Sequence, residues 1–311
     1  MRTLILFVAI VFLNNACSNS SAETPKSEVK DQYLSLYGNW VGQFIAVPVK
    51  PSDSLGTWQA PTNRINLIIK KIDPDLRVTA ESIVAGNKRK LVGQMEVSEG
   101  AYIFSLREPG NDKHDGVFEF TIAEEDGKAN LKGTWTAFDS SLPVVKREYS
   151  LARQAFRYDK NLMLSEEYEL FYDFYDSKAV TVTDTVSTSD TTDTYSIDDT
   201  STFEVRTYQR DLYAFAGESI FTINASKRKL KAEELKNLKK LELEIIRNTI
   251  FARHGYTFKK RKMRQFFDFV DWYVPVSTNI TKELTTIEKE NIELLLRFEN
   301  YATNYYDSFG R

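Results

Sequence analysis

The sequence contains very little cysteine and histidine. Cys17 is the only cysteine among 311 residues, so no disulfide can form within the chain. His114 and His254 are the only histidines, and a metal centre would have to combine one of them with distant carboxylates. A Ser-His-Asp arrangement would likewise have to use one of these two residues. We therefore predict no catalytic residues, no metal site and no cofactor.

The N-terminus lacks an apolar run long enough to span a membrane, yet it has the features of an export signal. Arg2 is followed by ten apolar residues from Leu4 to Leu13, whereas a spanning helix needs about 20. Asn14-Asn15-Ala16-Cys17 resembles a lipobox, although Leu13 stands one place earlier than usual. We expect a lipoprotein signal peptide over residues 1–17, with Cys17 lipidated, and a flexible tether over 18–32. The alternative is an ordinary signal peptide and a free thiol.

Lipidation of Cys17 would determine where the protein is located. Two or three acyl chains on one residue hold a protein stably on a bilayer without any transmembrane helix. We expect an extracytoplasmic protein of the bacterial cell envelope, anchored to a membrane and facing either the periplasm or the cell surface.

Residues 33–158 have the alternating pattern of an antiparallel β domain. Apolar residues recur at every second position, as in Ile65, Leu67 and Ile69, and again in Phe118, Phe120 and Ile122. Turn dipeptides separate these segments, and we expect their glycines to supply the positive φ of tight hairpins: Gly86-Asn87, Glu99-Gly100, Asp115-Gly116 and Asp126-Gly127. The spacing predicts about eight strands, which remove their exposed edges most easily by closing into a barrel.

Two features of this domain have alternative interpretations. Gly38-Asn39-Trp40 resembles the Gly-X-Trp that opens lipocalin and avidin barrels, so the interior could hold a small ligand or could be filled by side chains such as Trp40. The polar stretch from Glu108 to Gly116 could be a metal loop, but it lacks EF-hand spacing. We favour a filled barrel and a long polar hairpin.

Residues 159–225 are expected to link two domains. From Thr181 to Thr202, 18 of 22 residues are Ser, Thr or Asp, and none is basic. Such a segment buries too little to order itself, so we expect a disordered acidic loop over 181–202. A solvated hairpin is the alternative, because threonine and valine favour strands.

The pattern becomes helical after Ser226, a candidate N-cap. Leu235, Leu238, Leu241 and Ile245 follow one stripe of a helix that Gly255 should end. A short helix near Met263 and a last helix from about Thr285 complete a small bundle over 226–301, with a tail over 302–311. The predicted fold class is thus α+β, with a barrel followed by helices.

The C-terminal part carries a series of motifs. They are Arg247-Asn248-Thr249-Ile250, Phe251-Ala252-Arg253-His254-Gly255, Tyr256-Thr257-Phe258 and Trp272-Tyr273-Val274-Pro275, followed by a closing helix. In their order and spacing, residues 243–299 resemble the YARHG domain family, with Phe251 in place of the usual Tyr. The resemblance implies a bacterial extracellular module and implies no particular chemistry.

Two sets of candidate site residues follow. The first is a binding or structural corner at Arg253, His254, Gly255, Tyr256, Trp272 and Tyr273. We favour a structural role, with His254 at a helix C-terminus and Arg253 on terminal carbonyls or on an acid such as Asp268 or Asp271. The second is a basic cluster that could form an electrostatic surface: Lys259, Lys260, Arg261, Lys262 and Arg264.

Charge is unevenly distributed along the chain. The net charge of −3 divides into +6 after residue 226 and −9 before it. The basic cluster could contact anionic envelope polymers or another envelope protein, or could simply offset the acidic half. Nucleic acid is a poor candidate, because the chain is acidic overall and has the features of an exported protein. The function expected is non-catalytic binding or scaffolding, with a small-ligand carrier or a carboxylate-dependent glycan hydrolase as alternatives.

Overall fold

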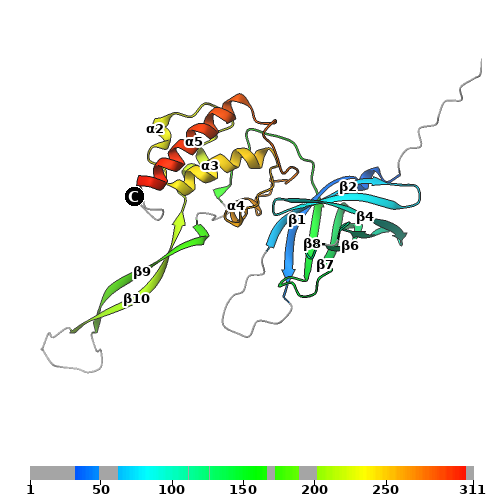
Figure 1. The fold of residues 1–311 in the computed structure, drawn as a ribbon, viewed down its shortest axis with the longest axis horizontal. Coiled ribbons are helices and arrows are strands. Elements are labelled where there is room, and N and C mark those ends of the chain that lie inside the picture. The colour runs from blue at the N-terminus through cyan, green and yellow to red at the C-terminus, as the bar shows by residue number, and fades with distance from the viewer. Residues whose placement is uncertain are drawn as a thin grey trace, which may run out of the picture.

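The structure is a computed structural model that describes residues 32–48, 62–110, 112–125, 127–166, 172–188 and 202–305. Within these residues the chain forms a closed eight-stranded barrel, a helical domain and a two-stranded hairpin (Figure 1). The predicted class, an antiparallel barrel followed by a small helical bundle, is confirmed. The expected signal peptide, Cys17 and the tether up to residue 31 lie outside the described residues.

The barrel is a simple meander in which each strand pairs antiparallel with the next. A short 3-10 helix, η1 (Leu34–Leu36), precedes it, and β8 pairs with β1 to close it. Its strands are β1 (Gly38–Val47), β2 (Thr62–Ile72), β3 (Arg77–Val84), β4 (Asn87–Ser98), β5 (Ala101–Arg107), β6 (Gly116–Glu125), β7 (Lys128–Ala137) and β8 (Lys146–Arg153).

Aromatic rings fill the barrel interior and contact one another. Phe104 stacks on Phe120 with ring centroids 4.6 Å apart. The ring centroid of Phe44 lies 6.1 Å from that of Phe118 and 6.0 Å from that of Trp135. Trp40 is fully buried, and its indole N–H donates to the carbonyl of Leu36 at 2.9 Å. This packing favours a filled barrel over a ligand-holding cup.

The turn residues behave as expected at some positions and differently at Gly116. Glu99 and Gly100 both have positive φ, 49° and 80°, and together form the two-residue turn between β4 and β5. Gly116 instead begins β6 without a positive φ. A Cβ there would lie 2.7 Å from the Trp135 ring, so the glycine is required by close packing rather than by a turn.

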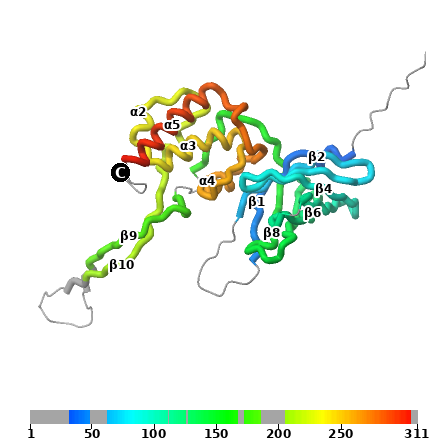
Figure 2. The backbone as a smooth tube through the Cα atoms, viewed as in Figure 1, coloured from blue at the N-terminus to red at the C-terminus, as the bar shows by residue number. Residues whose placement is uncertain are grey.

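Residues 172–215 differ from the expected linker. β9 (Tyr172–Thr188) and β10 (Thr202–Phe215) form an antiparallel hairpin, so Thr181–Thr188 and Thr202 are strand residues rather than loop. The alternation of valine and threonine, which favours extended pairing, outweighs the repulsion of the acids. Residues 189–201 lie outside the described part of the chain. Figure 2 shows the backbone running out from the helical domain along β9 and returning along β10.

The helical domain contains five helices within the described residues. They are α1 (Ser219–Thr222), α2 (Ala232–Leu235), α3 (Lys240–Arg253), α4 (Arg261–Phe267) and α5 (Thr286–Tyr305). α3 packs against α5 (Figure 1), and apolar side chains such as Ile245, Ile250 and Leu295 are fully buried between the helices.

The predicted helix from Ser226 onward is wrong in one respect, because two helices replace it. The carboxylate of Glu234 accepts a hydrogen bond from the Lys231 amide at 2.9 Å, and that of Glu242 accepts one from the Lys239 amide at 2.8 Å. Each glutamate therefore caps a new N-terminus three residues before it. Ser226 caps neither helix. The apolar stripe continues across the break because Leu235 and Leu238 both pack in the core.

Candidate functional site

Arg253, at the end of α3, is almost completely buried. Its side chain is 1% exposed, and its guanidinium donates to the carbonyl of Leu162 at 2.7 Å and to the hydroxyl of Ser226 at 3.0 Å. These partners differ from the expected acids, Asp268 and Asp271, because Arg253 holds the segment after the barrel against α3. A buried guanidinium with these protein partners is a structural element.

His254 follows Arg253 and is also buried and paired. Its Nε2 lies 2.9 Å from Oε2 of Glu288, and its ring stacks on Tyr158 with centroids 4.3 Å apart. Glu288 is fully buried and also accepts hydrogen bonds from the amide and hydroxyl of Thr285. Burial alone would raise the pKa of Glu288, but the hydrogen bonds from His254, Ser226 and Thr285 outweigh it and bring that pKa to about 2.

Gly255 occupies a position that only glycine fits. Its φ is +70°, and a Cβ would lie 2.4 Å from the Val276 side chain and 2.8 Å from the Phe156 ring. The carbonyl of Gly255 accepts hydrogen bonds from the amides of Val276 and Ser277. These contacts favour the structural interpretation of the Arg253-His254-Gly255 corner.

The aromatic candidates divide between the core and the surface. Tyr273 is buried, and its hydroxyl donates to the carbonyl of Tyr256 at 2.6 Å. Trp272 donates to the carbonyl of Met163 at 2.8 Å and packs on the helical core. Only the half-buried Tyr256 lines a cleft.

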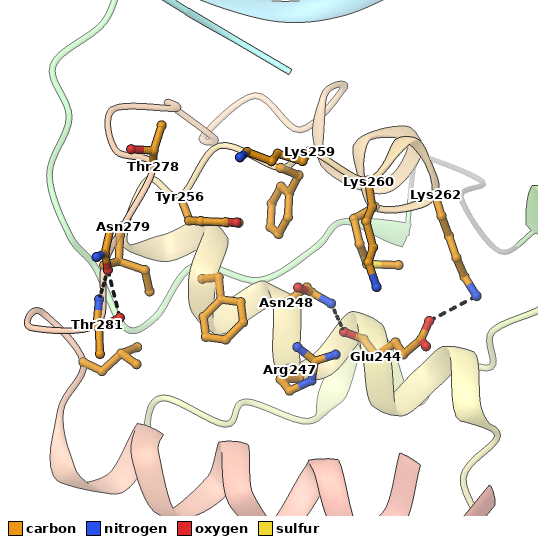
Figure 3. A pocket seen from close by; sticks show the side chains of 15 residues that line it. Glu244, Arg247, Asn248, Tyr256, Lys259, Lys260, Lys262, Thr278, Asn279 and Thr281 are labelled. Carbon is orange, nitrogen blue, oxygen red and sulfur yellow. Dashed lines mark hydrogen bonds and ion pairs between the residues drawn. The ribbon is translucent and has the colours of Figure 1, made fainter. Parts of the chain in front are cut away.

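A cleft of about 720 Å³ opens on the helical domain beside the corner. α3, the segment after Gly255, α4 and the loop before α5 form its walls (Figure 3). Its lining is largely apolar, with six aromatic or aliphatic side chains: Phe251, Tyr256, Phe258, Met263, Ile280 and Leu284. Arg247 and Asn248, which the motif analysis singled out only as a lead-in, also line it.

Four cationic side chains line this cleft, and two of them are paired within the protein. Arg247 forms a two-bond ion pair with Glu299, and Lys262 lies 3.1 Å from Glu244 and 3.2 Å from Asp173. Lys259 and Lys260 are exposed, and neither has an acidic partner within the described ranges. Figure 3 shows these two lysines across the cleft from Arg247 and Asn248.

The rest of the basic cluster does not face the cleft. The guanidinium carbon of Arg261 lies 4.4 Å from the ring centroid of Tyr175 in the hairpin. The side chain of Arg264 donates a hydrogen bond to the carbonyl of Lys259. The five basic residues therefore do not form one surface. Lys259, Lys260 and Lys262 reach the cleft, while Arg261 and Arg264 contact other parts of the domain.

A comparison with protein-family models identifies this part of the chain. Residues 218–300 match the YARHG domain. The C-terminal part of the protein is a YARHG domain. The match begins at residue 218, ahead of the motifs that start at 243, and so includes α1 and α2. Searches of curated proteins and of solved structures found no match to the chain.

The YARHG domain docks onto the barrel through residues within and between its motifs. The amide of Arg64 donates to the carboxylate of Asp268 at 3.0 Å, and Asn66 donates to the carbonyl of Pro275 at 2.8 Å. At the turn between β3 and β4, the amide of Gly86 donates to the hydroxyl of Thr257 at 3.0 Å. These bonds fix the barrel against the segment that carries Lys259.

α4 anchors the base of the hairpin to the YARHG domain. The buried Asp173 of β9 accepts a hydrogen bond from Gln265 at 2.9 Å in addition to the ion pair with Lys262. Gln265 also accepts a bond from the amide of Phe174 at 3.1 Å. One wall of the cleft, α4, is thus held in place by the hairpin.

The sequence did not predict the observed contacts of several of these residues. Arg64 lies in no motif that we used. Asp268 was named only as a possible partner of Arg253, and Glu288 only as part of the closing helix, so the contacts of Asp268 with the barrel and of Glu288 with His254 were not foreseen. Glu288 carried one signal, its position three residues after Thr285, which is the spacing of a capping box.

The described ranges contain neither a metal centre nor a spanning helix. Among the described residues, no three His, Cys, Asp or Glu side chains lie together in a way that could hold a metal ion. None of the helices in these ranges is long and apolar enough to cross a membrane.

Proposed function

We propose that this protein is a lipid-anchored, extracytoplasmic protein of the bacterial cell envelope, and that its YARHG domain binds a partner without catalysing a reaction. The observation that carries the proposal is the cleft, which combines apolar walls with the exposed ammonium groups of Lys259 and Lys260. Binding sites commonly have this composition, because apolar walls supply affinity and a few polar groups set orientation.

The side chains of the cleft support binding better than they support hydrolysis. A carboxylate-dependent glycan hydrolase needs two carboxyl groups facing one substrate. Glu244 is the one carboxylate among the described residues that line the cleft, and Lys262 neutralises it at 3.1 Å. The small-ligand carrier is the weaker alternative, since the barrel interior contains rings in mutual contact.

The proposed membrane anchor rests on Cys17 and the ten apolar residues that precede its lipobox-like sequence. Replacing Cys17 with Ser removes the thioether and should move the protein from the membrane fraction to the soluble fraction. Ser21→Ala, a change in the same segment, is the control and should leave the protein with the membranes. Membrane association of the Cys17→Ser protein would contradict the anchor.

The binding role is tested by charge reversal in the cleft. The protein with Lys259→Glu and Lys260→Glu should be retained on isolated envelope material roughly tenfold less at low salt, because two attractions become repulsions. Lys282→Glu with Lys289→Glu makes the same change in net charge at exposed positions outside the cleft. Equal retention of the two double variants would exclude the cleft as the binding surface.

A further inference from the structure

We propose that the cleft of the YARHG domain takes an acidic peptide segment of a partner protein. An aromatic or aliphatic side chain of that segment occupies the apolar wall, and its carboxylates meet Lys259 and Lys260. This inference rests on the proposed binding function and specifies the ligand class. It follows from three properties of the cleft: its uncompensated charge, its aliphatic wall and the engagement of its two asparagines.

The uncompensated charge is positive and confined to two side chains. Arg247 and Lys262 also line the cleft, but each is already paired, with Glu299 and with Glu244 and Asp173. Lys259 and Lys260 remain available for carboxylates of a ligand. The segment that carries them is attached to the barrel, because the hydroxyl of Thr257, two residues before Lys259, accepts a bond from the amide of Gly86.

The apolar part of the lining favours an apolar group. Met263, Ile280 and Leu284 are aliphatic or thioether side chains, and Phe251 and Tyr256 add ring surface. Hydroxyl groups placed against such a wall would lose hydrogen bonds to water without replacement. An apolar side chain placed there would gain by leaving water.

Two other polar side chains of the cleft, Asn248 and Asn279, are engaged within the protein. The amide of Asn248 donates to the carbonyl of Glu244 at 2.7 Å, and Asn279 accepts bonds from the amide and the hydroxyl of Thr281 (Figure 3). A glycan needs many donors and acceptors for its hydroxyls, and the engaged atoms of these two asparagines offer it none. A peptide with one apolar side chain and adjacent carboxylates needs only what the cleft provides.

The test uses a labelled heptapeptide, Asp-Thr-Tyr-Ser-Ile-Asp-Asp, which copies residues 193–199 of the chain and combines apolar and acidic side chains. A panel of heptapeptides moves the tyrosine and isoleucine to each position. Fluorescence anisotropy with the full chain should show that the best acidic peptide binds at least about fivefold more tightly than its Asp→Asn counterpart. Replacing its tyrosine and isoleucine with serine should also weaken binding.

Three protein variants assign that binding to the cleft. Lys260→Gln and Leu284→Ala should each raise the dissociation constant by about fivefold, while Lys282→Gln, an exposed lysine outside the cleft, should leave it unchanged. Thermal melting of each variant confirms that it is folded. Peptide binding that is insensitive to Lys260→Gln and Leu284→Ala would overturn the assignment.

A hyaluronate oligosaccharide serves as the glycan probe and separates the two levels of the proposal. Suppose that the oligosaccharide binds in a Lys260-dependent way, while no acidic peptide of the panel binds better than its neutral counterpart. The peptide assignment then fails, and the binding function stands. If Lys259→Glu with Lys260→Glu also leaves envelope retention unchanged, both fail.

Discussion

The carboxylate of Asp268 accepts a hydrogen bond from the backbone amide of Arg64 at 3.0 Å, across the boundary between the YARHG domain and the barrel. Both residues are buried, and the carbonyl of Asp268 also accepts a bond from the side chain of Gln43 at 2.7 Å. Burial raises the pKa of Asp268 from 3.8 to about 7, although the bond from Arg64 and nearby arginine charges act in the opposite direction. This contact should make domain docking depend on pH.

The first prediction concerns Asp268→Asn and follows from this raised pKa. Between pH 4 and pH 7 the folded protein retains a proton on Asp268 that the unfolded chain releases, so stability falls as pH rises through this window. The amide side chain introduced by the substitution does not titrate. We therefore compare the melting temperatures of Asp268→Asn and the unchanged protein at each pH. The difference, variant minus unchanged protein, should increase from pH 5 to pH 8.

Asp271→Asn is the control for this experiment, because Asp271 is an exposed neighbour on the same segment. Its pH profile should parallel that of the unchanged protein. Identical profiles for all three proteins would contradict the titration of Asp268 near neutrality.

The second prediction concerns Glu288 and has the opposite sign. Its folded pKa of about 2 lies below the usual 4.5, so its contribution is present above pH 4.5 and is lost as pH falls toward 2. Glu288→Gln should lower the free energy of unfolding at pH 7 by roughly 2–4 kcal/mol, because it breaks a buried charged network. The measurement is urea denaturation at pH 7 and pH 3.

A double-mutant cycle with His254 tests the same contact. Glu288→Gln, His254→Ala and the double variant should be non-additive, since the two side chains lie 2.9 Å apart. Strict additivity would mean that the His254–Glu288 contact contributes nothing of its own. A destabilised His254→Ala protein would also support the structural role of this residue over a binding role.

The third prediction compares two glycines with the same backbone conformation. Gly255 and Gly127 have φ values of +70° and +72°, but an added Cβ meets three close atoms at Gly255 and nothing within 4 Å at Gly127. Gly127→Ala should cost about 1 kcal/mol for the backbone strain alone. Gly255→Ala should cost about 2–4 kcal/mol, because Val276 and Phe156 must also move. Equal costs in chemical denaturation would show that packing around Gly255 relaxes freely.

These contacts indicate which features were predictable from the sequence. The barrel was predictable, because Phe118, Phe120 and Ile122 alternate along a strand whose other face is solvated. Apolar residues at every second position specify that geometry directly. The YARHG domain was also predictable, because its motifs are ordered and closely spaced. Both follow from local pattern.

The interface and the cleft were not predictable, since they depend on pairing between distant segments. Arg64 and Asn66 alternate with buried residues of β2 in the way that solvent-facing residues do, yet both are buried in contact with the YARHG domain. Arg247 and Lys262 have the same formal charge as Lys260. Only their partners Glu299, Glu244 and Asp173 show that they are neutralised.

The last prediction addresses the hairpin, whose base and outer part should differ in importance for stability. At the base, Asp173 is fully buried and contacts Lys262 and Gln265 of α4. Further out, side chains such as Val205 and Tyr208 are 65% and 48% exposed. Removing residues 179–211 and joining Lys178 to Leu212, which pair across the two strands, through Asn-Gly therefore deletes little packed surface among the described residues.

We expect the shortened protein to melt within about 2 °C of the full chain, because the described part of the deleted hairpin makes few buried contacts. Asp173→Asn, which leaves the hairpin length unchanged, should lower the melting temperature by several degrees, because Lys262 loses a buried partner. A drop of several degrees in the shortened protein would show that the outer hairpin stabilises the fold. If Asp173→Asn instead melted like the unchanged protein, α4 would not depend on the hairpin for its position at the cleft.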